Sequence, residues 1–299
     1  MKKLLLLLSV VIAGCGGGGE AFSTQPITQT YNSNLKPTDL TLSCVTKANM
    51  QKTENIIPVD NVESEYGMDN NFWGIQTPVN YSEYLNINWS QCIGTGFSDK
   101  NIVVSRWTWD MGPNLTAAGG IKSYPEIVFG RKPVGISKNK SSFPLLISSI
   151  KKLQVNWSIE IDKNNSSSNL LLESWISSNP KPNGLTDGTM VAELAIILDC
   201  WGATNGWCNP NGEKVNIGGY DYIFAVNKGP ISGNPDMISF NSVTPQLGKG
   251  GVDLGLFLNF LKSRGLLTDN QYINDVEFGT EIVSGKGELR LNSYSVTVN

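Results

Sequence analysis

The chain consists largely of short apolar runs that are interrupted by Gly, Asn and Pro. Runs of this kind are typical of β-strands separated by turns. The clearest cover residues 102–109, 152–161, 192–198, 220–226, 237–243 and 288–298. From Tyr220 to Val226 apolar residues occupy alternate positions, which predicts a strand with one buried face. Many short strands with few helices favour an all-β sandwich or jelly roll of two antiparallel sheets.

One segment, about 252–264, instead predicts an α-helix packed on the sandwich. Its apolar residues have the spacing i, i+3, i+4 and i+7 of a helical stripe: Leu254, Phe257, Leu258 and Leu261. Asp253 lies in the expected first turn. Lys262 and Arg264 lie in the last turn, and Gly265 follows as a stop.

The N-terminus predicts export. Two lysines precede an apolar stretch that is too short to span a bilayer, so we expect residues 1–14 to be a signal peptide. The stretch ends in Ala13-Gly14-Cys15, which resembles a bacterial lipobox, with Cys15 as the lipidated first residue of the mature protein. Ordinary cleavage after Ala13 or Gly14 is the alternative. We expect a membrane-anchored lipoprotein at the cell surface or outer membrane, and otherwise a secreted protein.

Composition separates a linker from a domain. Residues 15–42 are rich in small and polar residues without apolar periodicity and predict a flexible linker. Residues 43–299 are long enough to form one domain with a substantial core.

The net charge of −3 and the lack of a basic cluster argue against a nucleic-acid partner. We expect a monomer whose membrane contact is the lipid on Cys15.

Four cysteines remain after Cys15: Cys44, Cys92, Cys200 and Cys208. An even number in an oxidising compartment favours two disulfides. Cys200 and Cys208 flank a loop with Gly and Asn, which predicts a local bridge and leaves Cys44–Cys92 as the second. A metal site is the alternative, disfavoured because there is no CxxC spacing and no histidine.

The absence of histidine also limits the chemistry. It excludes Ser-His-Asp and Cys-His mechanisms and leaves carboxylates, Lys, Tyr or Cys for general acid–base catalysis. Nothing in the sequence points to a cofactor. For an exported enzyme that acts on a polymer, a pair of carboxylates is the leading hypothesis.

Glu193 is an acid inside an otherwise apolar predicted strand. One face of this strand carries Leu194, Ile196 and Leu198. Glu193 therefore points the other way, together with Ala195 and Ile197, where it either faces solvent or lines a cleft. Glu281 follows a glycine at position 279, where a backbone or a ligand can approach closely.

Several motifs, taken in order, resemble glycoside hydrolase family 12, the compact jelly-roll endoglucanases and xyloglucanases. They are Asn-Asn-Phe-Trp-Gly at 70–74, the Trp107/Trp109 strand, Lys-Ser-Tyr-Pro at 122–125, the Glu193 strand at 192–197, Gly-Thr-Glu at 279–281 and Ser-Tyr-Ser-Val at 293–296. Cys44 and Cys92 flank the first motif, like a disulfide common in the family. The resemblance covers about residues 44 to 299 and implies a sandwich with a concave substrate cleft.

The resemblance implies endo-acting hydrolysis of β-1,4-glucosidic bonds in cellulose, xyloglucan or mixed-linkage glucan. It implies that Glu193 is the nucleophile and Glu281 the acid/base of a retaining mechanism, in which the carboxyls lie about 5–5.5 Å apart. Burial and the nearby Glu193 charge are the expected reasons for a raised pKa of Glu281. Glu173 aligns with an aspartate that supports the nucleophile, although its side chain is longer; surface exposure is the alternative.

Aromatic residues are the expected sugar platforms. The motif position implies this role for Trp73. Trp107 and Trp109 share one face of their strand and are further candidates, with core packing as the alternative. Asn71 either hydrogen-bonds a sugar hydroxyl or holds a turn.

Ala195 and Ile197 depart from the family, which has Met and Trp after the nucleophile. They predict a smaller, less aromatic floor beside Glu193. Either another side chain fills the space, such as Trp175 or Trp201, or the substrate or the rate differs. A non-catalytic, glycan-binding surface lipoprotein on the same fold is the alternative function, and a purely structural lipoprotein is the third.

Overall fold

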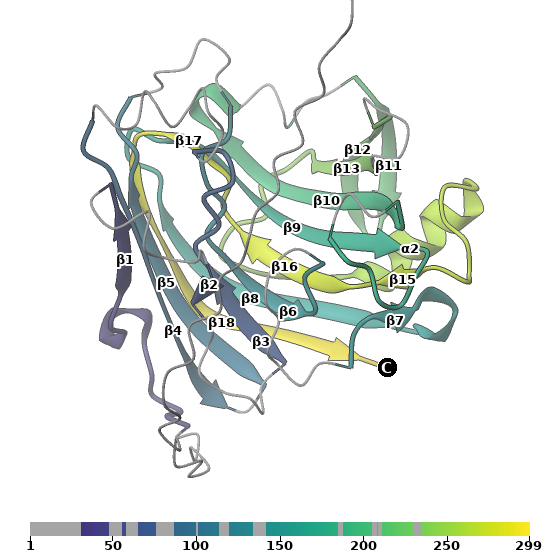
Figure 1. Cartoon of the computed structure of the whole chain (residues 1–299), viewed down its shortest axis with the longest axis horizontal. Helices are drawn as coiled ribbons and strands as arrows, with labels where there is room; N and C mark the ends of the chain where they lie inside the picture. The colour runs from purple at the N-terminus through teal and green to yellow at the C-terminus, as the bar shows by residue number, and fades with distance from the viewer. Residues whose placement is uncertain are drawn as a thin grey trace, which may run out of the picture.

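The computed structural model describes residues 31–47, 56–57, 65–75, 87–99, 101–113, 120–133, 142–184, 188–204, 208, 211–229 and 235–299. Over these residues the chain forms two stacked β-sheets with an α-helix at one side (Figure 1). The expected signal peptide, the lipidation site Cys15 and residues 16–30 lie outside the described residues.

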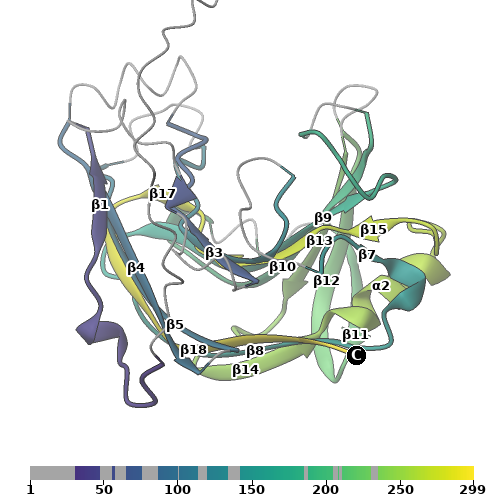
Figure 2. The same ribbon diagram turned by 60° about the horizontal axis from the view of Figure 1, so that its bottom comes forward.

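The smaller sheet, here called the outer sheet, has six strands in the spatial order β1 (Ser43–Thr46), β4 (Ser90–Asp99), β5 (Ile102–Asp110), β18 (Lys286–Val298), β8 (Leu153–Asp162) and β14 (Lys249–Asp253). The larger, inner sheet has the order β11 (Glu213–Ile217), β12 (Tyr220–Asn227), β13 (Asp236–Ser242), β10 (Met190–Trp201), β9 (Ser167–Ser177), β16 (Asp275–Gly279), β6 (Glu126–Gly130), β3 (Tyr66–Asp69) and β2 (Ile56–Ile57). Three short strands of this sheet lie outside the main order. β15 (Tyr272–Ile273) pairs with β7 (Leu145–Leu146) and with β9, and β17 (Ile282–Ser284) pairs with β9. Both sheets bend the same way, with the inner sheet inside the curve of the outer one (Figure 2).

The six predicted strands are present as β5, β8, β10, β12, β13 and β18, with bounds that differ by at most three residues. One pair departs from the expected antiparallel pattern, because β10 and β13 run parallel. The chain leaves β10, forms the antiparallel pair of β11 and β12 at the edge, and returns as β13 in the direction of β10.

Alternation along the strands fills the core between the sheets. In β10, Leu194, Ile196 and Leu198 lie in the core, and none is more than 1% exposed. Tyr222 and Phe224 of β12 also face the core, as the alternation predicts. Tyr220 is 44% exposed, because it begins the strand directly after a turn.

The predicted helix is α2 (Leu254–Ser263), and its apolar stripe is buried. The ring of Phe257 lies 5.3 Å from that of Tyr222 and 5.0 Å from that of Phe240, measured between centroids. Asp253 precedes the helix rather than lying in its first turn. Its carboxylate accepts a hydrogen bond from the backbone N of Gly255 at 3.0 Å and so caps the N-terminus.

Both predicted disulfides are confirmed. Cys44–Cys92 joins β1 to β4 with an S–S distance of 2.06 Å. Cys200–Cys208 joins the end of β10 to the segment that follows it, with an S–S distance of 1.99 Å. Residues 31–42, expected to belong to the linker, lie against the outer sheet: Asn32 N donates to Phe97 O at 3.3 Å. Folded structure therefore begins before residue 43. In the described part of the chain, no helix combines the length and the apolar character needed to cross a bilayer.

Candidate active site

The face of the inner sheet that points away from the outer sheet is here called the concave face. In β16, Val276 and Phe278 lie in the core, so their strand neighbours Asp275 and Glu277 point to the concave face. The same alternation in β10 directs Glu193 to this face, since Leu194 points into the core.

Carboxyl groups concentrate on the concave face. This acidic cluster draws on five adjacent strands and the segment after β16, and comprises Asp69, Glu126, Glu173, Glu193, Asp275, Glu277 and Glu281. Five members are at most 6% exposed, whereas Glu193 and Glu281 are partly exposed. Glu193 and Glu281 are therefore the most exposed members of the cluster. In the described residues no group of three or more Cys, Asp or Glu side chains is arranged to hold a metal ion.

Glu281 lies in the short connection between β16 and β17, where Asn169 of β9 holds it. Asn169 Nδ2 donates to Glu281 Oε2 at 2.6 Å, and Glu281 N donates to Asn169 Oδ1 at 3.1 Å. A third hydrogen bond of 3.1 Å runs from Asn169 N to Glu281 O. The preceding residue, Thr280, is anchored from the outer sheet, because Trp107 Nε1 donates to its Oγ1 at 3.1 Å. These contacts fix the position of the Glu281 carboxyl.

Burial raises the pKa of both partly exposed glutamates. It raises the pKa of Glu193 to about 7, and the charge of Glu281 adds to this effect. It also raises the pKa of Glu281 to about 7, while the Asn169 donor acts in the opposite direction by favouring the ionised carboxylate. Each of the two carboxyls therefore changes its protonation state near neutral pH.

Glu173 lies beside this pair. Its backbone is paired with Ala195 of β10 and with Glu277 of β16, and its side chain is buried, which excludes the surface alternative. Burial, followed by the charge of Glu193, holds the pKa of Glu173 well above its usual range. These surroundings favour the neutral acid, which can donate a hydrogen bond. Its support of Glu193 stays a prediction.

Trp107 and Trp109, expected as sugar platforms, are core residues. They are 0% and 2% exposed, so neither ring offers a free face to a sugar. The structure therefore corrects this expectation. The physical reason is the alternation of β5, in which the polar Arg106 and Thr108 occupy the partly exposed positions and leave both tryptophans on the core side.

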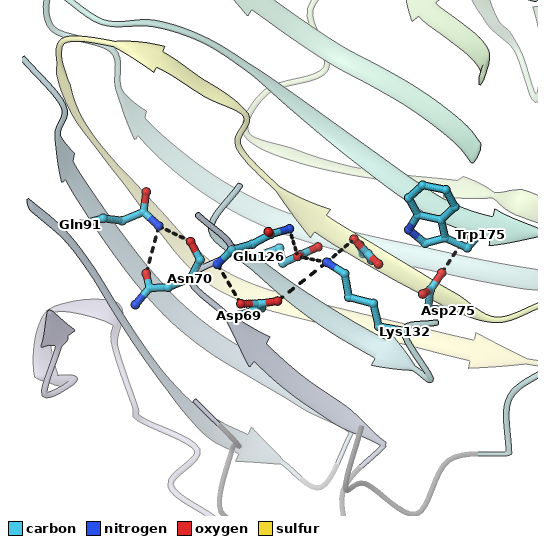
Figure 3. Close-up of polar contacts among 9 residues, drawn as sticks. Asp69, Asn70, Gln91, Glu126, Lys132, Trp175 and Asp275 are labelled. Carbon is cyan, nitrogen blue, oxygen red and sulfur yellow. Dashed lines mark hydrogen bonds and ion pairs between the residues drawn. The ribbon is translucent and has the colours of Figure 1, made fainter. Parts of the chain in front are cut away.

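Trp73 is 48% exposed, as a sugar platform requires. The chain just before it is anchored by a buried contact, in which Gln91 Nε2 donates to Asn70 Oδ1 at 3.0 Å (Figure 3). The platform role of Trp73 stays a prediction.

Asn71 holds a turn. Its backbone is left-handed, with φ of 30°, and its N donates to Asp69 Oδ1 at 2.7 Å. Its side-chain Nδ2 donates to Glu126 Oε1 at 3.1 Å. The side chain thus ties the turn to the acidic cluster, and contact with a sugar hydroxyl stays a prediction.

The floor beside Glu193 is formed by a small apolar cluster of Tyr124, Leu171, Ala195 and Ile197. The disulfide Cys200–Cys208 packs against it. Tyr124 and the disulfide therefore pack beside Ala195 and Ile197 of β10. Trp201 does not, because it belongs to the main core. Trp175 is buried and is paired directly opposite Glu193 across β9 and β10, so it is the predicted side chain that lies beside Glu193.

Sequence reasoning missed six residues of this site: Asp69, Glu126, Lys132, Asn169, Asp275 and Glu277. Glu277 carries the signal that identified Glu193, an acid between apolar residues of one strand. Glu126 directly follows the Lys-Ser-Tyr-Pro motif. No local pattern marks Lys132 or Asn169, whose carboxylate partners Glu277 and Glu281 are 145 and 112 positions away.

Comparisons with known proteins agree with this geometry. The family model described as "Glycosyl hydrolase family 12" matches residues 64–299. Endoglucanase S of Pectobacterium parmentieri is 27% identical over 247 residues, which are 79% of this chain and 82% of that protein. A probable xyloglucan-specific endo-β-1,4-glucanase A of Aspergillus terreus is 25% identical over 240 residues, 76% of this chain and 85% of that protein.

A solved structure has the same fold. The family 12 xyloglucanase from Bacillus licheniformis, in complex with a ligand, superposes with a TM-score of 0.63 at 21% identity, covering 86% of this chain and 100% of that one. The jelly-roll sandwich expected from the sequence is therefore confirmed.

Replacement of Asn169 by leucine tests how the Glu281 carboxyl is held. The ionised carboxylate would lose a donor at 2.6 Å, so we expect the pKa of Glu281 to rise from about 7 by about one unit or more. Carboxyl ¹³C NMR titration measures this value. Asn241→Leu is the matched control, a buried asparagine of the same sheet bonded to Ile223 and Ser239 instead. An unchanged Glu281 pKa in Asn169→Leu would contradict the assignment.

Proposed function

Because the chain belongs to glycosyl hydrolase family 12, it is a glycoside hydrolase, and we propose that it cuts β-1,4-glucosidic bonds within glucan chains with retention of anomeric configuration. One observation carries this proposal. Glu193 and Glu281 are the partly exposed members of an acidic cluster that is otherwise buried. The two carboxyl groups that a retaining mechanism requires are therefore available to a substrate on one face of one sheet.

In the first step the Glu193 carboxylate attacks the anomeric carbon, and the bond between this carbon and the leaving glycosidic oxygen breaks. Glu281 gives its proton to that oxygen, so the leaving sugar departs as an alcohol. The raised pKa of Glu281, about 7, supports this role, because a carboxyl group with an ordinary pKa would be ionised near neutral pH.

In the second step the ester formed on Glu193 carries no charge. Glu281 then no longer faces a neighbouring anion, and its pKa falls. It accepts a proton from water as the water attacks the anomeric carbon and the bond to Glu193 breaks. Asn169 stabilises the ionised Glu281 of this step, since its Nδ2 donates to Oε2 at 2.6 Å.

The substrate class we propose is cellulose, xyloglucan or mixed-linkage glucan. The names of the relatives, an endoglucanase and a xyloglucan-specific endo-β-1,4-glucanase, support it. Trp73 is the proposed platform, because the C–H faces of a glucose ring pack on an exposed indole.

Release of reducing ends from carboxymethyl cellulose, xyloglucan and mixed-linkage glucan tests the proposal. We expect wild-type protein to hydrolyse at least one of the three, and Glu193→Gln and Glu281→Gln to lose about 10²–10⁴-fold in kcat, because each removes a group that acts in the transition state. Glu160→Gln is the matched control. Its glutamate lies on the outer sheet with a side chain 63% exposed, and its activity should equal wild type.

Binding of the polymers, followed by affinity electrophoresis, separates catalysis from recognition. The two catalytic variants should bind glucan about as well as wild type. Hydrolysis that survives in both variants would contradict the assignment of Glu193 and Glu281. A wild-type protein that binds glucan but releases no reducing ends would contradict the proposed reaction.

We further propose that the protein is exported and anchored by a lipid on Cys15. The apolar stretch before Ala13-Gly14-Cys15 supports this. Expression in a bacterium fed a labelled fatty acid tests it: wild type should carry the label in the membrane fraction, and Cys15→Ser should lose the label and leave that fraction. Unlabelled wild-type protein, or label retained in Cys15→Ser, would contradict the anchor.

A further inference from the structure

Lys132 follows the end of β6 and places its ammonium group inside the acidic cluster. Its Nζ contacts Glu126 Oε1, lies 3.2 Å from Glu277 Oε2 and lies 3.8 Å from Asp69 Oδ2 (Figure 3). The lysine side chain is 11% exposed, and those of both glutamates are 0% exposed. The ammonium is therefore a buried positive charge within the cluster.

The carboxyls that surround Lys132 continue across the sheet towards Glu193. Glu277 of β16 is paired with Glu173 of β9, which is paired in turn with Ala195 of β10. Ala195 and Glu193 point to the same face. Since neighbouring strands lie about 4.8 Å apart, the backbones of Glu277 and Ala195 are about 10 Å apart. Charges in a buried row are screened little by water and salt, so they act over such a distance.

We infer that Lys132 and Glu277 are opposed positioning residues for the reaction: the ammonium favours the ionised carboxylate of Glu193, and the Glu277 carboxylate opposes it. This inference rests on the proposed function, in which Glu193 must be ionised to attack. Neither residue needs to touch the substrate, because both act through the charge state of Glu193.

The surroundings of Glu193 support the two directions. The charged or titratable groups that act on it are Glu173 from β9, Glu277 from β16, Glu281 from the β16–β17 connection, and Lys132, while β13 places the uncharged Met237 beside it. Burial raises the pKa of Glu193 most, and the charge of Glu281 is the next largest cause. The charge of Glu277 also raises this pKa, whereas the charge of Lys132 lowers it. Burial raises the pKa of Glu281 and the Asn169 donor lowers it, whereas neither Lys132 nor Glu277 is among the groups that shift it.

The predicted signs follow from this arrangement. The acidic limb of the pH profile of kcat/KM reports ionisation of Glu193, and the alkaline limb reports loss of the proton from Glu281. Removing the ammonium makes ionised Glu193 less favourable, so the acidic limb moves to higher pH. Removing the Glu277 charge moves it to lower pH. Removing both charges leaves it near its wild-type position.

The experiment compares full-length Lys132→Met, Lys132→Arg, Glu277→Gln and the double variant Lys132→Met/Glu277→Gln with wild type, using a soluble aryl β-cellobioside. We expect an acidic-limb shift of about 0.5–1 pH unit upward in Lys132→Met and a similar shift downward in Glu277→Gln. Lys132→Arg and the double variant should lie close to wild type, with the alkaline limb unmoved in all four.

Lys163→Met is the matched control. Lys163 pairs with Asp199 on the inner sheet at 2.5 Å but lies outside the row that leads to Glu193, so neither limb should move. Circular dichroism and thermal unfolding check the fold of each variant. If Lys132→Met does not fold, Glu277→Gln alone still decides, because it must move the acidic limb downward.

Unmoved acidic limbs in the folded single variants would overturn the inference, as would a joint shift of both limbs. Unmoved limbs overturn it even if Glu126 takes up a proton and so cancels the lost lysine charge. Failure of the proposed function looks different: Glu193→Gln would then keep its activity. An inactive Glu193→Gln together with unmoved limbs in the Lys132 and Glu277 variants would overturn this inference alone.

Discussion

The pleat of the inner sheet is the constraint on which the rest of the molecule depends. Successive side chains of a strand point to opposite faces, so burial of Leu194 between the sheets commits Glu193 to the concave face. A slip of one residue in β10 would drive a carboxylate into the core and leave leucines on the outside, at the cost of both packing and charge solvation. The apolar contacts that hold the sheets together therefore also aim the reactive groups.

Crowding of carboxyls on that face has an electrostatic consequence. So many acids cannot all be ionised in a buried setting, and protons neutralise some of them: burial raises the pKa of Asp69 to about 6 and holds that of Glu126 well above its usual range. Lys132 compensates part of the remaining charge. Burial gives the two partly exposed glutamates pKa values of about 7, the range in which one can attack as an anion while the other supplies a proton.

Local periodicity was enough to predict the strands, the helix and the direction of Glu193, because each depends on neighbours within a few positions. The role of Glu281 depended on a family motif, since its position is fixed by Asn169, 112 residues away. For Trp107 and Trp109, the sequence itself indicates a position in the core. Polar residues at the alternate positions of their strand already mark those positions as the solvent side. Lys132 could not be predicted, because a buried ammonium is stabilised only by carboxylates that the completed fold brings together.

A covalent bond between Glu193 and the sugar is the most direct consequence of the proposed chemistry. In a 2-deoxy-2-fluoro β-cellobioside with a good leaving group, the fluorine slows both steps, and the leaving group accelerates the first. The glycosyl–enzyme ester therefore accumulates and can be located by peptide mass spectrometry. We predict one added fluoro-cellobiosyl mass on the peptide that contains Glu193, and none in Glu193→Gln. A label on another carboxyl, or hydrolysis of the reagent with inversion at the anomeric carbon, would contradict the assignment of Glu193 as the nucleophile of a retaining hydrolase.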